Sequence, residues 1–553
     1  MEDTHLARTI DRLVDTELDL EPLRRTYHGR GSNPHQPAFL LKLVLFETHR
    51  GFFQPTQWLR DLRENMVVKW LTYGLRVSKT TLYEFRDRVS PFLEGWLGQT
   101  VRTAIREGHT DAKSAALDGT YFAANSSRHR LVTLETVERR LEQLKSASLP
   151  AEAAVTVMPE ASHGVTETSV PETAVTSESP VATAPPVATA PPAATAPPAA
   201  AVPPAATTPA AATDPAATTA PATTTAPTVA PRPAWMSCSE LGRKRQERRL
   251  LQAKEVLEEL HAQNTQRRKD KQKAAKQIRV SLGDFQAPLG RDKLDVFRPL
   301  YNAQVMSDLK TDLALAFDVR PSISDNGQLV PMIGRTVRVT GRSLADVLVD
   351  SGYPSGPELK MCASLKVTVF GPWQENSFTS TRSRTSSEKQ LIPKEQFVWD
   401  PELESYRCPK GKLLTFAKST TKQKANGDYR QLDIYQAPVA DCATCPVRSQ
   451  CTQSKKGTRM VQRQPDEEFI DELKKRMQTP EAKSLYKQRC CTIERRFADM
   501  RTHRNFQRIS GQTPQRAQTQ VGLTLLAHNL VTLNSLRVRR SAPSPEIAAN
   551  DNP

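Results

Sequence analysis

The chain has 553 residues, with 77 Lys and Arg against 60 Asp and Glu, and carries a formal net charge of +17. This length exceeds one domain and predicts roughly three or four structural units. No run of about 18 apolar residues occurs, and the first residues lack the charged-then-apolar pattern of an export signal. We therefore expect a cytoplasmic, nucleoid-associated protein with no membrane partner.

One long stretch, residues 148–232, consists almost wholly of Ala, Pro, Thr and Val and should form no core. It holds six acids and one Arg, so the rest of the chain has a surplus of 76 − 54 = +22. Such a surplus favours a polyanionic partner, of which nucleic acid is the commonest. A generally basic surface without a dedicated partner is the alternative.

The N-terminal part, residues 1–110, has the pattern of a compact helical domain. Three short helices are predicted there, at residues 37–46, 56–62 and 78–86. Because Arg86 and Arg88 give the third helix a basic end, the segment suits a helix-turn-helix-like DNA-binding module. A small helical bundle used for dimerisation is the alternative.

A strand that carries one acid opens the next unit, for which we expect residues 111–130 to supply the first part. Residues 115–128 are apolar around Asp118, which is followed by a Gly-Thr step and small polar residues. A lone carboxylate on a core strand is costly unless its charge is compensated, usually by a divalent cation. The alternative is that Asp118 merely ends a strand at a turn.

Two amphipathic helices are predicted on either side of the Ala/Pro/Thr stretch. Their apolar positions, spaced by three and four, are Leu134, Val137, Leu141 and Leu144, and then Leu250, Ala253, Leu257 and Leu260. This is the spacing of a coiled-coil seam, so residues 131–280 should form an antiparallel helical hairpin, with its second helix over about 240–279. The disordered linker 148–232 would interrupt this hairpin at little thermodynamic cost. The basic run 267–273 is either a solvated helix face or a phosphate-contacting one.

The middle of the core is expected at residues 281–373. Its predicted elements are a β-hairpin from 301–308 and 313–319 and a helix over about 326–333. Residues 343–350 then read as a buried strand ending in Asp350. Acids at the carboxyl ends of strands face the crevice where ligands bind in α/β sheets. A strand-terminating turn aspartate is the alternative.

A Cys-rich insertion is predicted at residues 374–465, with a mobile first part that extends to about residue 395. Its four cysteines are Cys408, Cys442, Cys445 and Cys451. The Cys-x-x-Cys spacing of the middle pair lets two thiolates reach one ion, and the outer pair could complete a tetrahedral, structural zinc site. Free thiols are the alternative. The remaining cysteines, for which burial is expected, are Cys238, Cys362, Cys490 and Cys491.

The last part of the core is expected at residues 466–540, followed by a disordered tail over 541–553. A long helix that starts at Pro480 carries Tyr486, Arg489 and Glu494 and runs on through Arg496 and Arg501; a final helix covers 518–536. Spacings of three and five residues let the first three side chains bracket one edge of a site. A surface ion pair would explain Glu494 equally well.

Several short motifs follow one another in a specific order outside the linker and the tail. They are residues 37–46, residues 80–86, Asp118-Gly-Thr with Asn125, Tyr301-Asn-Ala-Gln, Asp350-Ser-Gly-Tyr, the four cysteines, Tyr486 with Arg489, and Glu494-Arg-Arg-Phe. In this order they resemble the DDE transposases of bacterial insertion sequences, closest to the insertion-sequence eleven-eighty-two group.

The resemblance implies an α/β fold with an RNase H-like mixed-sheet catalytic core. It also implies that Asp118, Asp350 and Glu494 form an acidic triad. Residues expected to contact DNA or position its phosphates are Tyr486, Arg489, Arg496, Arg501 and Asn125. The implied partners are inverted-repeat DNA ends and target DNA, with a homodimer as the default assembly.

Three carboxylates suit this chemistry because two Mg²⁺ ions, roughly 3.5 to 4 Å apart, can activate the attacking oxygen and stabilise the departing one. Carboxylate oxygens are the ligands that Mg²⁺ prefers. Asp118 is expected to bridge the ions, with Asp350 and Glu494 each completing one side. Two alternatives remain open: a catalytically inactive, transposase-derived DNA-binding protein, and a metal-dependent nuclease without strand transfer.

Overall fold

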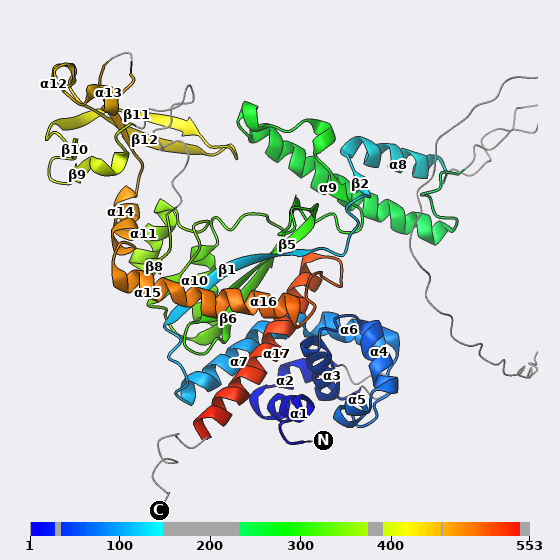
Figure 1. The fold of residues 1–553 in the computed structure, drawn as a ribbon. Helices are drawn as coiled ribbons and strands as arrows, with labels where there is room; N and C mark the ends of the chain where they lie inside the picture. The colour runs from blue at the N-terminus through cyan, green and yellow to red at the C-terminus, as the bar shows by residue number, and fades with distance from the viewer. Residues whose placement is uncertain (1, 28–34, 148–231, 374–390, 455–456, 542–553) are drawn as a thin grey trace, which may run out of the picture. The chain divides into compact units, whose positions relative to one another are not determined.

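The computed structural model describes residues 2–27, 35–147, 232–373, 391–454 and 457–541 (Figure 1). The predicted linker and tail lie outside these ranges except for their end residues, Arg232 and Ser541, and most of the predicted mobile segment 374–395 lies outside them too. The chain divides into two units, Met1–Ala147 with Ser237–Pro553, and Ser148–Met236. The description below concerns the first unit.

Short helices fill the N-terminal part, as predicted. They are α1 (Leu6–Glu17), α2 (Glu21–Arg24), α3 (Pro37–His49), α4 (Pro55–Glu64), α5 (Met66–Leu71), α6 (Lys79–Val89) and α7 (Leu93–Arg106). Proline occupies the first turn of α3 and α4, and the Ser78 hydroxyl accepts the Thr81 N–H at 3.1 Å at the start of α6.

The basic end of α6 is engaged within the protein. Arg86 is buried and pairs with Asp87 at 2.9 Å, and the Arg88 guanidinium lies 4.2 Å from the ring centre of Tyr27. Both arginines thus have intramolecular partners, which weakens the sequence argument that they form a DNA-facing surface.

A six-stranded mixed sheet follows. Its strands are β1 (Ser114–Ala123), β4 (Leu289–Arg291), β5 (Phe297–Asp308), β6 (Ala314–Arg320), β7 (Asp346–Leu348) and β8 (Thr368–Phe370). The order is β4-β5-β1-β7-β8, with β6 also paired to β5. β1, β4 and β6 run antiparallel to β5, whereas β7 runs parallel to both β1 and β8. The predicted β1 strand and β5–β6 hairpin are confirmed.

Helices of the core pack against this sheet and against the N-terminal helices. They are α10 (Leu329–Thr340), α11 (Gly356–Ser364), α14 (Glu467–Arg476), α15 (Pro480–Arg489), α16 (Arg495–Thr502) and α17 (Pro514–Ser541). A Cβ on Gly522 of α17 would lie 2.6 Å from the Phe317 ring and 2.9 Å from Leu93. This close approach joins α17, β6 and α7 in one hydrophobic core.

The helices on either side of residues 148–236 are α8 (Leu134–Ser146) and α9 (Glu240–Gln266). Glu138 and Lys254 join them by an ion pair of 3.1 Å. The predicted extension of the second helix to Arg279 is wrong, because Asn264 exchanges hydrogen bonds of 2.8 and 2.9 Å with the Lys273 main chain and folds the chain back. The next residues lead into β3 (Val280–Ser281), which pairs with β2 (Leu131–Val132).

Residues 391–463 form a second, antiparallel sheet that the sequence analysis did not predict. Its strands are β9 (Val398–Asp400), β10 (Ser405–Arg407), β11 (Leu413–Gln423), β12 (Tyr429–Gln436) and β13 (Met460–Arg463). The short helices α12 (Val439–Ala443) and α13 (Arg448–Cys451) follow β12. Trp399, Tyr406 and Tyr435 pack edge to face, with ring centres 5.0 to 5.5 Å apart, and form its small core.

The four cysteines of this region line one small cavity of about 30 Å³ and form no disulfide. Cys408, Cys442 and Cys451 pack against the aromatic core as apolar side chains, and burial raises the pKa of the Cys451 thiol. Within the described ranges, no group of three or more His, Cys, Asp or Glu is arranged to hold a metal ion. The zinc site predicted at these cysteines is therefore not found.

Two other boundaries also differ from the predictions. The helix expected at residues 326–333 is α10, which begins later because Gly327, at φ +78°, turns the chain before it. The strand expected at 343–350 is β7 alone, so Asp350 lies two residues beyond the strand end. Among the helices of the described ranges, none combines the length and apolarity needed to cross a bilayer.

Candidate active site

Beside the central strand of the mixed sheet, an arginine lies between two acids. The Arg489 guanidinium, at the end of α15, is 2.9 Å from Asp118 Oδ1 on β1 and 3.4 Å from Glu494 Oε1. Its side chain is 8% exposed, compared with 19% for Asp118 and 49% for Glu494. Two acids that are far apart in the sequence are thus joined through one buried cation.

Asp350 belongs to the same cluster through the sheet register. β1 and β7 are parallel, with Ala116 opposite Leu348. Asp118 and Asp350 each lie two residues beyond this pair, and the charge of Asp350 acts on Asp118. The Asp350 carboxylate accepts the Ser351 N–H at 2.6 Å, and its charge raises the pKa of both Asp118 and Arg489.

Burial is the main influence on the pKa of Asp118. Burial, with smaller contributions from the charges of Asp350 and Asp325, raises this pKa, whereas Arg489 and the Gly119 N–H lower it; the resulting pKa is about 6. Asp118 is thus a largely buried carboxylate whose charged neighbours include two further acids and one guanidinium.

A wide helical turn sets the position of Glu494. Residues Cys490–Glu494 form a π-helical turn between α15 and α16. Five residues separate Arg489 from Glu494, a spacing that matches the i→i+5 repeat of a π-helix rather than the α-helical repeat. The turn therefore brings the Glu494 carboxylate within reach of the Arg489 guanidinium, which also contacts Asp118. Tyr486, one turn earlier, is hydrogen-bonded to Arg489, and burial raises the pKa of its hydroxyl.

A fourth acid, Asp325, was not predicted. Its Oδ1 accepts the amide N–H groups of Gln304 and Asn302 at 2.6 and 2.7 Å, from positions on β5 opposite Gly119 and Tyr121. A Cβ on Gly119 would lie 2.4 Å from Asp325 Oδ1, so only glycine beside Asp118 leaves room for this acid. The Asn302 and Gln304 amides stand in a motif that the sequence analysis singled out, but nothing in the sequence linked them to Asp325.

Two cations face the same part of the sheet. Arg501 on α16 donates hydrogen bonds to the Thr120 hydroxyl and, at 3.4 Å, to the Tyr121 carbonyl. Lys293, which the sequence analysis did not single out, lies near Arg501, Asp118 and Glu494, and burial lowers the pKa of its ammonium group. Both could neutralise phosphate charge beside the acids.

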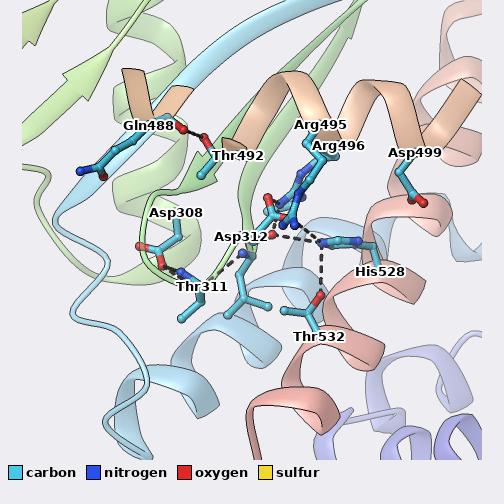
Figure 2. Close-up of polar contacts among 12 residues, drawn as sticks. Asp308, Thr311, Asp312, Gln488, Thr492, Arg495, Arg496, Asp499, His528 and Thr532 are labelled. Atoms are coloured by element: carbon cyan, nitrogen blue, oxygen red, sulfur yellow. Dashed lines mark hydrogen bonds and ion pairs between the residues drawn. The ribbon is translucent and has the colours of Figure 1, made fainter. Parts of the chain in front are cut away.

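Two of the predicted DNA contacts lie elsewhere. Arg496 is 1% exposed, and its Nη2 donates to Asp312 Oδ1 at 2.8 Å; Figure 2 shows it pointing from α16 toward Asp312, with His528 of α17 close by. The Asn125 side chain donates to the Ser510 carbonyl at 2.7 Å. These contacts give both residues a role in holding segments of the chain together.

Family models match two parts of the chain. A Transposase DDE domain matches residues 407–534, and a Transposase domain (DUF772) matches residues 1–88. Both matches are to families described as transposase domains. The DDE match includes Arg489, Glu494 and Arg501 but begins after Asp118 and Asp350. Searches of curated proteins and of solved structures found no match.

The four acids of this site, Asp118, Asp325, Asp350 and Glu494, fit a hard cation. DDE transposases generally use divalent metal, and the four carboxylates offer only oxygen donors, the type that Mg²⁺ prefers. In the described chain, however, no three of these groups are already placed to share one ion, and Arg489 stands between Asp118 and Glu494. An ion bound by both acids would require the Arg489 guanidinium to move aside.

Proposed function

We propose that the protein is a DNA transposase that binds the ends of its element and catalyses Mg²⁺-dependent strand cleavage and strand transfer. The observation that carries this proposal is the bridge from Arg489 to Asp118 and Glu494, with Asp350 beside Asp118. An acid on the central strand of a mixed sheet, between antiparallel and parallel neighbours, supports an RNase H-like core.

Asp118, Asp350 and Glu494 are the residues that would hold two Mg²⁺ ions. When bound, such ions supply activation of the attacking oxygen and stabilisation of the leaving oxygen. Asp118 must be ionised to take part, which its pKa of about 6 allows at neutral pH. Asp325 would add negative charge from the other side of Gly119 and favour cation binding further.

The basic residues at the site would position the DNA. Displaced from the acids, the Arg489 guanidinium and the hydrogen-bonded Tyr486 hydroxyl would face the phosphate that reacts. Arg501 and Lys293 would neutralise neighbouring phosphates. We do not assign Arg496 and Asn125 to this set, because their side chains bind Asp312 and the Ser510 carbonyl, respectively.

The partners follow from the same proposal. The net charge of +17 suits binding to double-stranded DNA, both at the inverted-repeat ends and at the target. A homodimer is the assembly we propose, since joining two ends in one reaction needs both ends to be held together. The N-terminal helices, which match a transposase domain, would contribute to end binding.

The proposal is tested by cleavage of a plasmid that carries the gene with its flanking DNA, with and without MgCl₂. Asp118→Asn, Asp350→Asn and Glu494→Gln should each lower the cleavage rate at least about 1,000-fold, or roughly 4 kcal/mol of transition-state stabilisation, and leave DNA affinity unchanged. Glu481→Gln, an exposed acid on the same helix, is the matched control and should cleave normally.

Each outcome decides between the candidate functions. Normal cleavage by any of the three variants removes that residue from the site. A wild-type protein that binds the flanking DNA but never cuts it would be an inactive, transposase-derived binding protein. Cleavage without joining to a supercoiled target would indicate a nuclease.

A further inference from the structure

A basic pocket lies at the end of β1, beyond the acids. It has a volume of about 560 Å³ and is lined by Ala124, Asn125, Ser126, Ser127, Arg128, His129, Arg298, Pro299 and Arg508. Three arginines and one histidine contribute to this lining, and no acid does. Such a concentration of positive charge favours an anionic ligand.

The charges of the pocket are only partly neutralised from outside it. Arg298 pairs with Asp292 at 2.9 Å. Arg128 is exposed, and its Nε donates to His129 Nε2 at 3.0 Å rather than to an acid. The exposed Arg508 guanidinium has no ion pair or hydrogen bond with another residue of the described chain. Two of the three guanidinium groups therefore have no acidic partner among the residues that the structure describes.

The pocket is fixed to the elements that carry the acids. Ala124 N donates to the Pro299 carbonyl at 3.0 Å, which continues the pairing of β1 with β5. Ile509 N donates to the Ala123 carbonyl at 2.9 Å, so the segment after α16 lies beside the end of β1. The Asn125 bond to Ser510 adds a third link. The pocket thus has a defined position relative to Asp118.

We propose that this pocket binds a backbone phosphate of the DNA strand that is cut at the acids, near the bond that reacts. The inference rests on the proposed function. Ala124 is 124 − 118 = 6 residues from Asp118, or about 20 Å along an extended strand. Base pairs rise by about 3.4 Å along the duplex, so the bound phosphate lies within about six base pairs of the reacting bond.

The test measures the affinity of the full-length protein for a DNA duplex in EDTA over a series of salt concentrations. Arg128→Gln and Arg508→Gln should each weaken binding about 5-fold near physiological salt and lower the slope of log affinity against log salt by about 0.9, the value for one lost phosphate contact. Arg130→Gln is the matched control: it is exposed and two residues from Arg128 but does not line the pocket, so affinity and slope should stay as in the wild type.

Backbone substitution locates the contact. Neutral methylphosphonates placed one at a time along the strand should weaken wild-type binding at one position within about six base pairs of the cleaved bond, and the Arg128→Gln/Arg508→Gln double variant should lose that sensitivity. Arg128→Lys/Arg508→Lys, which keeps the charge, should retain most of the salt slope.

The failure of this inference is distinguishable from failure of the proposed function. If both Gln variants keep wild-type affinity and slope while the wild type still cleaves DNA, the pocket does not contact the backbone. Binding of inorganic phosphate by the wild type, without any loss of DNA affinity in the variants, would overturn the proposal in favour of a small-anion site. Loss of Mg²⁺-dependent cleavage in the wild type itself would overturn the proposed function instead.

Discussion

Two buried arginines, seven residues apart on the run of helices from α15 to α16, have opposite electrostatic surroundings. Arg496 pairs with Asp312, a carboxylate that also pairs with Arg495 at 3.1 Å and whose main-chain oxygen lies 3.0 Å from His528 Nε2. Arg489 pairs with Asp118 and Glu494, and the charge of Asp350 raises its pKa. One acid shared by two arginines anchors a helix, whereas several acids around one arginine could accommodate a further cation.

The histidine beside Arg496 strengthens the contrast. Burial and the neighbouring Arg496 hold the pKa of His528 well below its usual range, so its ring stays neutral near physiological pH. The Arg496 cluster, seen with Thr532 in Figure 2, should therefore respond little to pH. Asp118, with a pKa of about 6, should respond strongly.

The largest effect on stability is expected when the ion pair between Asp312 and Arg496 is removed. Asp312→Ala leaves the Arg496 guanidinium buried without a counter-charge and should lower the free energy of unfolding by about 3 to 5 kcal/mol. Urea unfolding followed by circular dichroism measures this change. Asp295→Ala, which removes an exposed pair with Arg291, is the control and should cost less than about 1 kcal/mol. Equal effects of the two variants would contradict an anchoring role for Arg496.

A smaller effect is expected when the cation between the acids is removed. Arg489→Gln should lower stability by about 2 to 3 kcal/mol at pH 8 in EDTA, because several carboxylates then repel one another without compensation. MgCl₂ should raise the melting temperature of this variant toward the wild-type value. The increase for the wild type should be smaller. A variant that is as stable as the wild type in EDTA would show that Arg489 does not neutralise the cluster.

The smallest effect concerns the pH dependence at Asp118. Its pKa in the folded protein, about 6, lies above the ordinary 3.8, so the proton stabilises the fold; this stabilisation is complete below about pH 4 and is lost as the pH rises through 6. The side chain of the Asp118→Asn variant is neutral at every pH. The free energy of unfolding of this variant should therefore exceed that of the wild type by about 1 to 2 kcal/mol at pH 8 in EDTA. The two proteins should be equally stable near pH 4, and a constant difference across this range would contradict the raised pKa.

The sequence was informative where one element carries its own pattern. The apolar run around Asp118, the hairpin that became β5 and β6, and the proline that opens α3 all act through local backbone preferences, and these elements are confirmed. The proximity of Asp118, Asp350 and Glu494 followed from the family resemblance. Their catalytic role stays a prediction.

Other features depend on contacts between distant segments. Helical periodicity does not reveal a π-helical turn, which shifts the faces of every later residue. The family resemblance implied a DNA contact for Arg496, but its side chain is buried. Asp325 reaches the acids only because Gly119 lacks a side chain and two amides of β5 bind its carboxylate. Neither relation leaves a periodic signal in the sequence.

The route of the chain through the sheet also matters during synthesis. Thr120, on the strand that carries Asp118, bonds Arg501, which follows 381 residues later, and β1 acquires its neighbours β5 and β7 only in between. A nascent chain still attached to the ribosome before residue 489 has been made lacks both the cation and the last acid of the cluster. If the protein cuts DNA as proposed, this capacity would arise only when translation is almost finished.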